Sequence, residues 1–274
     1  MERTFATPEP VELYVELGKG DLEVTTDSVE ESRVHISGHH ADEAVVELDG
    51  RQLRVLAPRQ RAGFFGGGEQ SLDVVVFIPH GSALVTRTGS ADQVARGTYS
   101  SARVKSGSGD VRLDRITGHA VIDTGSGDIA VDEVGGELRT KSGSGDVAIT
   151  RVAGNAGVST GSGTVQLGTT NGSVVLKSGS GDLSVQQAHG DLSLSSASGD
   201  LIVATQHRGA LSAKNVSGDV RVGIPAGIPV WTDVSTVTGR IGSDLEGAGQ
   251  PGPGEDHVEI RATSVSGDIT LRQV

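Results

Sequence analysis

The sequence predicts an all-β fold, a single-chain β-solenoid similar to a parallel β-helix, with about 18 residues and two short strands in each coil. A Gly-Ser-Gly-Asp signature recurs every 18 residues from Asp110 to Asp200 and then after 19 residues at Asp219, and a second glycine recurs near the middle of each interval. Apolar and polar residues alternate between these glycines. Self-similarity at a fixed period of this length is typical of proteins built from stacked repeats.

The Gly-Ser-Gly-Asp signature predicts a corner that starts each coil. Glycine allows a positive φ or a close approach of the chain to its neighbours. We expect the Asp to accept hydrogen bonds from N–H groups of the turn, and Thr164 occupies the Asp position in one repeat. The predicted corner residues are Asp110, Asp128, Asp146, Asp182, Asp200 and Asp219, with Gly118, Gly136, Gly154, Gly172, Gly190 and Gly209 at the mid-coil turns.

Two strands are predicted in each repeat. In residues 110–127, Val111 and Leu113 alternate with polar residues, and Ala120 and Ile122 do so after the mid-coil glycine. This alternation indicates short strands with one buried face, and we expect coils to stack about 4.8 Å apart with each strand paired to its copy in the next coil. A core this narrow needs few large side chains, which agrees with 35% hydrophobic and 3% aromatic residues in a folded chain.

The ends of the chain depart from the regular repeat. Residues 1–88 predict an N-terminal β-rich cap that includes the first coils, because their strand-like runs do not keep the 18-residue register. A structurally different cap commonly protects the strand edges at the end of a solenoid. Residues 89–274 predict the solenoid itself, with a Gly/Pro-rich loop near residues 243–257 and a closing strand at the C-terminus.

One glycine-rich loop of the predicted cap contains candidate partner-contact residues. Its arginines and paired phenylalanines would offer basic and apolar side chains to a partner or to a membrane surface. We favour a hairpin loop whose phenylalanines fold back onto the cap, because exposed apolar pairs usually find local cover. The candidates are Arg59, Arg61, Phe64 and Phe65.

Composition excludes several classes of protein. The net charge of −12 argues against non-specific binding of nucleic acid or anionic lipid, although a local basic patch is compatible with it. The chain has no cysteine, so it has neither disulfides nor a thiolate zinc site. No long apolar run predicts a direct membrane span, and the first residues lack the apolar core of an export signal. We therefore expect a cytoplasmic protein that reaches a membrane only through a partner.

The repeated Asp residues do not predict a calcium site. Calcium-binding β-rolls need a Gly/Asp turn about every nine residues, whereas this corner occurs once in 18 residues and Thr164 interrupts it. Calcium also requires many oxygen ligands around each ion. The histidines show no metal spacing with carboxylates, and no glycine pattern predicts a phosphate site. We expect no catalytic, cofactor-binding or metal-binding residues.

Outward positions of the predicted strands include one candidate for catalysis on polysaccharides. Asp114 and Asp132 would stack one coil apart, as a candidate carboxylate pair for acid–base catalysis, but solvated surface charges are the simpler interpretation. No aromatic residue occurs between Tyr99 and Trp231, so the coils offer no platform for stacking a sugar. Outward positions of the second strands include Asp123, Arg139, Lys141, Lys177 and Lys214.

The Ser-Gly-Ser-Gly-Asp-Val corners and the closing segment Thr263–Ile269 resemble a bacterial β-strand-repeat family, catalogued as a "putative adhesin" domain of unknown function. The segment Ile228–Ser235 is similar to the actinobacterial members of that family. The resemblance extends over nearly the whole chain. It implies a β-solenoid, a link to cell-envelope stress responses in some relatives, and no catalytic residues.

These observations predict a non-catalytic β-solenoid scaffold or interaction protein, adhesin-like and linked to cell-envelope homeostasis. Its expected partner is another protein or a second copy of the chain, because the broad faces and edges of sheets suit association. Two alternatives remain open. One is a self-polymerising cytoplasmic scaffold of the bactofilin kind, and the other is a β-helix enzyme acting on polysaccharide.

Overall fold

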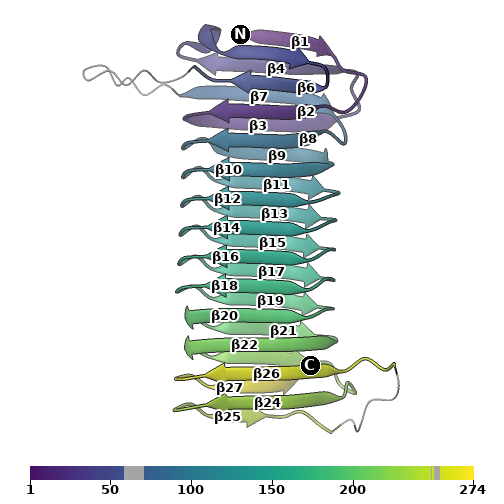
Figure 1. The fold of residues 1–274 in the computed structure, drawn as a ribbon, viewed down its shortest axis with the longest axis vertical. Coiled ribbons are helices and arrows are strands. Elements are labelled where there is room, and N and C mark those ends of the chain that lie inside the picture. The colour runs from purple at the N-terminus through teal and green to yellow at the C-terminus, as the bar shows by residue number, and fades with distance from the viewer. Residues whose placement is uncertain (59–70, 248, 250–253) are drawn as a thin grey trace, which may run out of the picture. The chain divides into compact units, whose positions relative to one another are not determined.

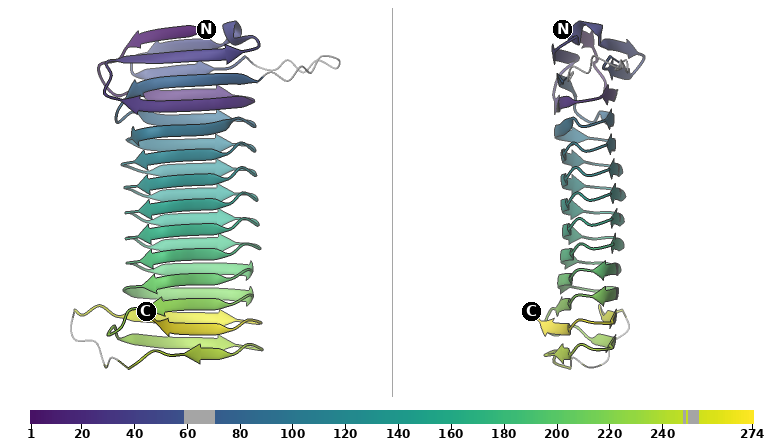
Figure 2. Two further views of the ribbon diagram at one scale, coloured as in Figure 1. Left: turned by 180° about the vertical axis from the view of Figure 1, so that it is seen from behind. Right: turned by 90° about the vertical axis from the view of Figure 1, so that its left-hand side faces the viewer.

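The computed structural model describes residues 1–58, 71–247, 249 and 254–274. The chain divides into two compact units, Met1–Glu133 and Val134–Val274. Both units consist of strands in two facing sheets, which confirms the predicted all-β solenoid (Figures 1 and 2). The candidate contact residues Arg59, Arg61, Phe64 and Phe65 lie outside the described residues, as does part of the predicted Gly/Pro-rich loop.

The unit Val134–Val274 is built from regular coils. Each coil contributes one strand to each sheet, and each strand pairs in parallel with its copy in the next coil, as Val147 does with Val165 and Val165 with Leu183. The first sheet runs in the order β15 (Val147–Val152), β17 (Val165–Thr170), β19 (Leu183–Ala188), β21 (Leu201–Gln206), β23 (Val220–Ile224), β27 (Ile269–Gln273) and β25 (Ile241–Ser243). The second runs in the order β14 (Leu138–Ser142), β16 (Ala156–Thr160), β18 (Val174–Ser178), β20 (Leu192–Ser198), β22 (Gly209–Ser217), β26 (Val258–Ser264) and β24 (Val230–Thr236).

The last coil of the chain lies between two earlier ones in this unit. β26 pairs with β22 on one side and with β24 on the other, and β27 lies between β23 and β25 (Figure 1). The repeat pattern predicts pairing between coils that are consecutive in sequence. Here β24 and β25 are displaced outward by the coil that follows them, so they form the outermost strands of the two sheets.

The unit Met1–Glu133 contains the strands that depart from the 18-residue register. One sheet runs in the order β1 (Glu2–Ala6), β4 (Glu31–Gly38), β7 (Leu72–Pro79), β3 (Gly20–Asp27), β9 (Asp92–Tyr99), β11 (Val111–Ile116) and β13 (Ile129–Val134). The other runs in the order β5 (Val45–Asp49), β6 (Gln52–Leu56), β2 (Glu12–Leu17), β8 (Ala83–Thr88), β10 (Ser101–Ser106) and β12 (Ala120–Thr124), and η1 (Ala41–Glu43) precedes β5.

Antiparallel pairing is confined to the outer end of that unit. β1 with β4, β4 with β7 and β5 with β6 are antiparallel, whereas β2 and β3 pair in parallel with both of their neighbours. The first coil in sequence, β2 with β3, therefore lies inside its two sheets. Strands that follow it in the chain cover it on both sides.

The core of each unit is a narrow layer between the two sheets. Alternate side chains of each strand point inward, so that Val147, Ile149, Val158 and Leu167 are almost completely buried. Burying one such side chain contributes about 1.5–3 kcal/mol. Hydroxyl groups end the inward rows beside the corners, where the hydroxyl of Ser142 donates to the Gly145 carbonyl at 3.0 Å. A thin core is sufficient because backbone hydrogen bonds connect every coil to its neighbours.

Removal of two whole coils should leave a folded protein. Deletion of residues 146–181 removes β15 to β18 and joins Gly145 to Asp182, which restores a Gly-Ser-Gly-Asp corner. We expect cooperative urea unfolding with a smaller m-value, because less surface becomes exposed and each repeat contacts only its neighbours. Circular dichroism during urea titration measures this. A half-coil deletion of residues 146–154 is the control, and it should not fold, since it exchanges the two strand positions; a non-cooperative transition for the two-coil deletion would contradict modular stacking.

Candidate functional site

The corner aspartates form hydrogen-bonded ladders along the edge of each unit. The Oδ1 atom of Asp182 accepts from the backbone N–H of Asp200 at 2.7 Å, and Asp200 accepts in the same way from Asp219 at 2.9 Å. The sequence led us to expect N–H donors within the same turn, but the donor belongs to the next coil. Further steps, each with an Asp side chain accepting from a backbone N–H of a neighbouring coil, include Asp92 from Asp110, Asp110 from Asp128, Asp146 from Thr164, Asp219 from Asp268, and Asp268 from Arg240.

These carboxylates therefore hold one coil on the next. The Thr164 N–H donates to Asp146, but Thr164 has no carboxylate that could accept from the N–H of Asp182, so the ladder is interrupted there. The mid-coil turn has its own acceptors, because Asn155 accepts from the Ser173 N–H at 3.0 Å and Asp191 from the Ala210 N–H at 2.9 Å. A side chain used in this way is a structural element of the solenoid.

The mid-coil glycines lie where two coils come into close backbone contact. A Cβ atom on Gly154 would lie 2.5 Å from the Gly136 carbonyl oxygen, and one on Gly172 would lie 2.5 Å from that of Gly154. Real Cβ atoms do not approach so closely, so another residue would force the coils apart. Gly209 is different because its φ of +90° is itself unfavourable for other residues.

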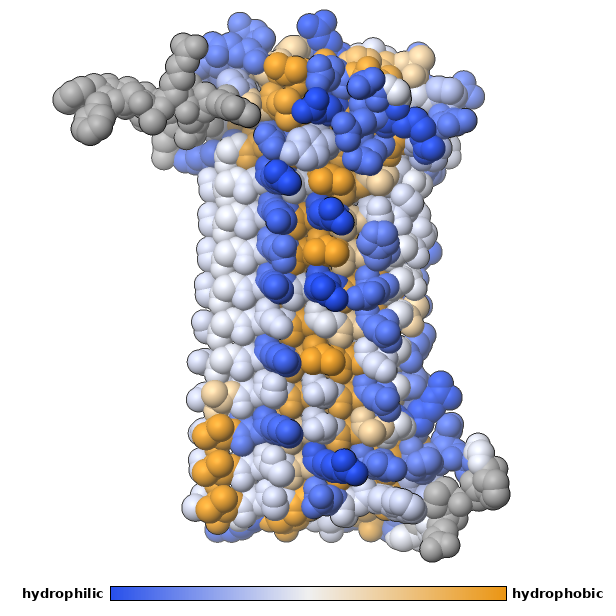
Figure 3. Space-filling model, viewed as in Figure 1, coloured by the Kyte–Doolittle hydropathy of each residue, from blue (hydrophilic) through white to orange (hydrophobic). Residues whose placement is uncertain are grey.

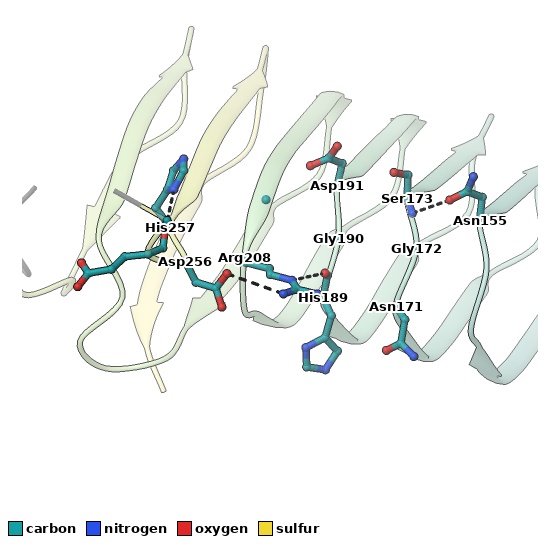
Figure 4. A pocket seen from close by; sticks show the side chains of 13 residues that line it. Asn155, Asn171, Gly172, Ser173, His189, Gly190, Asp191, Arg208, Asp256 and His257 are labelled. Carbon is teal, nitrogen blue, oxygen red and sulfur yellow. Dashed lines mark hydrogen bonds and ion pairs between the residues drawn. The ribbon is translucent and has the colours of Figure 1, made fainter. Parts of the chain in front are cut away.

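A groove of about 530 Å³ lies at the mid-coil corners of unit Val134–Val274, and it is the candidate site (Figure 4). Arg208 lies in it, donating through Nε to the His189 carbonyl at 2.9 Å and placing Nη1 3.8 Å from Asp256. Asp191 and His257 also line the groove. Positive and negative groups are mixed and solvated here, so the groove has no single charge that would select an ion.

Two histidines stack beside this groove. The rings of His189 and His207 are 4.2 Å apart between centroids and 8° from parallel. Burial lowers the pKa of His207, and the neighbouring His189 lowers it further. In the described part of the chain, the buried Nε2 atom of His207 has no hydrogen-bond partner. The lowered pKa therefore favours the neutral form of the His207 ring in the stack.

The sequence analysis did not single out this histidine pair. The two residues are 18 positions apart, so the repeat period alone places them in adjacent coils. Metal spacing with carboxylates, the one role predicted or excluded for the histidines, does not depend on stacking between coils. Across the residues that the structure describes, no group of three or more His, Cys, Asp or Glu side chains is arranged to hold a metal ion.

The candidate carboxylate pair, Asp114 and Asp132, lies in unit Met1–Glu133. The Oδ2 atom of Asp114 accepts from the Gly97 N–H at 2.8 Å, so this carboxylate closes a strand irregularity beside Tyr99. Burial raises the pKa of Tyr99, and the charge of Asp114 adds to that rise. The Tyr99 hydroxyl donates to the Val24 carbonyl at 2.9 Å. Asp114 therefore has a structural partner, and Asp132 is exposed.

Comparison with known proteins gives one family match and several structural similarities. A family model described as Toastrack DUF4097 matches residues 11–272. A "putative lipid binding protein" from Parabacteroides distasonis is similar over 100% of this chain and 96% of that chain, with 15% identity and a TM-score of 0.47. A "putative adhesin" from Bacteroides fragilis matches over 100% and 96%, with 12% identity and a TM-score of 0.32. No curated protein sequence is significantly similar to the chain.

The described residues form no helix with the length and apolar character needed to cross a bilayer.

The histidine stack should make stability depend on pH. Because the folded state lowers the pKa of His207, the unfolded state takes up the proton first as pH falls through about 6.5, and stability is then lost. We expect His207→Gln to lose less free energy of unfolding than the unmodified chain between about pH 8 and pH 5.5. Urea titrations at the two pH values measure it. The exposed His119→Gln is the control, and equal losses in all three proteins would contradict a role for His207.

The Asp ladder should respond to loss of the acceptor rather than of the charge. Asp182→Ala removes the partner of the Asp200 N–H, and we expect it to lower the free energy of unfolding by about 1 kcal/mol. Asp182→Asn keeps an acceptor oxygen and relieves repulsion between stacked carboxylates, so its effect should be smaller. Thermal and urea unfolding compare the two variants. Equal destabilisation by both would show that the hydrogen bond is not what matters.

Proposed function

The chain belongs to the Toastrack DUF4097 family, and from this premise we propose that it is a non-catalytic, adhesin-like β-solenoid that binds through surfaces displayed on a stack of coils. The carboxylates that repeat along the chain are hydrogen-bonded between coils, which supports a structural rather than a catalytic role for them. The proposal includes a cytoplasmic location, with membrane contact only through a partner. It also includes the link to the cell envelope that the family resemblance implies.

A column of exposed valines at the end of unit Val134–Val274 carries this proposal. Val216, Val265 and Val237 occupy equivalent corner positions on successive coils, because the Ser266 N–H donates to the Val216 carbonyl and the Thr238 N–H to that of Val265. They are 53%, 48% and 76% exposed. Figure 3 shows an apolar column along the corner of these coils. The regular corners have glycine at this position, as at Gly143, so apolar side chains are not needed to form the turn.

The outer edges of β24 and β25 adjoin this valine column. In the part of the chain that the structure describes, β24 pairs only with β26 and β25 only with β27. Their free N–H and C=O groups can pair with strands of another chain. We propose that the occupant is a second copy, because two identical ends related by a twofold axis present the same strands and valines to each other.

Self-association should depend on these valines. We expect the unmodified protein to dimerise with rising concentration and Val216→Ser with Val265→Ser to weaken the dimer at least about tenfold, since apolar area is removed from the interface. Light scattering coupled to size-exclusion chromatography measures the mass. The matched control is Val45→Ser with Val175→Ser, which removes exposed valines elsewhere.

Four outcomes would count against parts of the proposal. A monomer at all concentrations, or equal weakening in the control, would contradict self-association through this end. Filaments in electron micrographs would favour the bactofilin-like alternative. Release of reducing ends from a polysaccharide by the purified chain would contradict the non-catalytic role.

A further inference from the structure

A row of lysines crosses the outer face of the sheet formed by β14, β16, β18, β20, β22 and β26. Lys141 lies on β14, Lys177 on β18 and Lys214 on β22, and all three are exposed. The strand register places them in one line, with hydroxyl residues on the strands between. The line reads Lys141, Ser159, Lys177, Ser195, Lys214 and Thr263.

A groove of about 320 Å³ runs beside this lysine row. Val175, Ser193 and Ser212 line it on β18, β20 and β22, and Arg261 on β26 closes one end. In Figure 3, which shows this face, hydrophilic and apolar side chains form columns that cross the strands. Small side chains between larger ones leave room for a chain-like ligand along the row.

The lysines of the row and Arg261 have no acidic partners of their own, whereas Arg139 on β14 is paired with Glu137. Among the described residues, Lys141, Lys177, Lys214 and Arg261 form no ion pair, although the chain carries 35 acidic and 23 basic residues. Cations without partners in an acidic protein favour an anionic ligand, since attraction within a local patch survives an unfavourable net charge. The composition alone gave no reason to expect such a ligand.

The spacing of the row indicates the shape of the ligand. Neighbouring strands are about 4.8 Å apart, so lysines on every second strand recur at about 10 Å along one line. An extended disaccharide has a closely similar length. We propose that this face binds a linear anionic polysaccharide with one acidic group in each disaccharide, lying across the strands with its acidic groups on the lysines.

Other residues on this face favour a polysaccharide over two other polyanions. Asp191 and Glu259 also line the groove, where they would accept hydrogen bonds from sugar hydroxyls and repel a broad anionic membrane. Single-stranded nucleic acid needs aromatic side chains for base stacking, and β14, β16, β18, β20, β22 and β26 contain none. The exposed Trp231 lies on the outermost strand β24, opposite Glu259 in the register, and not on the strands that carry the lysines, so binding along the lysine row rests on ion pairs with an acidic polymer. This inference does not depend on the proposed self-association.

The test uses hyaluronan, which has one carboxylate in each disaccharide, and the full chain at low salt. We expect measurable binding by isothermal titration calorimetry that weakens as salt is added. The triple variant Lys141→Ser, Lys177→Ser and Lys214→Ser should weaken hyaluronan binding at least about tenfold, because each substitution removes one ion pair with a carboxylate of the polymer. The matched control, Arg112→Ser with Arg151→Ser and Arg272→Ser, removes the same charge from exposed positions of the other sheet.

The outcomes separate this inference from its competitors. Absence of hyaluronan binding, equal weakening in the arginine control, or equal binding of neutral dextran would overturn it. Tighter binding of oligo-deoxythymidine, or of vesicles containing phosphatidylglycerol, would overturn the choice of a polysaccharide. Unchanged circular dichroism and unchanged dimerisation in the lysine variant would show that any loss of binding belongs to this face alone.

Discussion

The close stacking of backbone on backbone at the coil corners is the constraint on which the rest of each unit depends. Successive coils approach until a Cβ at Gly154 would lie 2.5 Å from the Gly136 carbonyl. At this short separation, the N–H groups of one coil reach the carbonyl and carboxylate oxygens of the preceding coil, as in the bond from the Asp200 N–H to Asp182. Because these bonds connect neighbouring coils directly, a thin core of aliphatic side chains is sufficient.

The outermost strands of a stack leave backbone N–H and C=O groups unpaired along one edge, and in each unit one coil from near a chain end is covered by other strands. In Met1–Glu133 the first coil, β2 with β3, lies inside the sheets, and in Val134–Val274 the last coil, β26 with β27, does. In Val134–Val274 the strands nearest the C-terminus are thus hydrogen-bonded on both sides, whereas in Met1–Glu133 the N-terminal strand β1 remains at the edge of its sheet and pairs with β4. Fraying of the C-terminal strands is suppressed because local opening begins where backbone hydrogen bonds are exposed.

Corner, inward and outward positions of a coil have different structural requirements, and these requirements decide which positions can carry binding residues. Most corner positions require glycine or Asp, and inward positions require small or branched apolar residues, so outward positions and the few unconstrained corner positions are left to carry binding chemistry. The lysine row and the valine column both use this freedom. In the valine column, a corner position that does not require glycine has become apolar on the last coils, where the strand edges are also unpaired.

The sequence by itself determined the coil length, the two strands of each coil and the direction of each side chain, because these follow from local periodicity. It placed Lys141, Lys177 and Lys214 outward, and its period placed His189 beside His207. Only the tertiary structure decided that β26 lies against β22, which brings Arg261 to the end of the groove and Asp256 to Arg208. The reason is physical: all coils have nearly the same corner, so any coil can stack on any other, and the choice rests on long-range packing that local pattern does not contain.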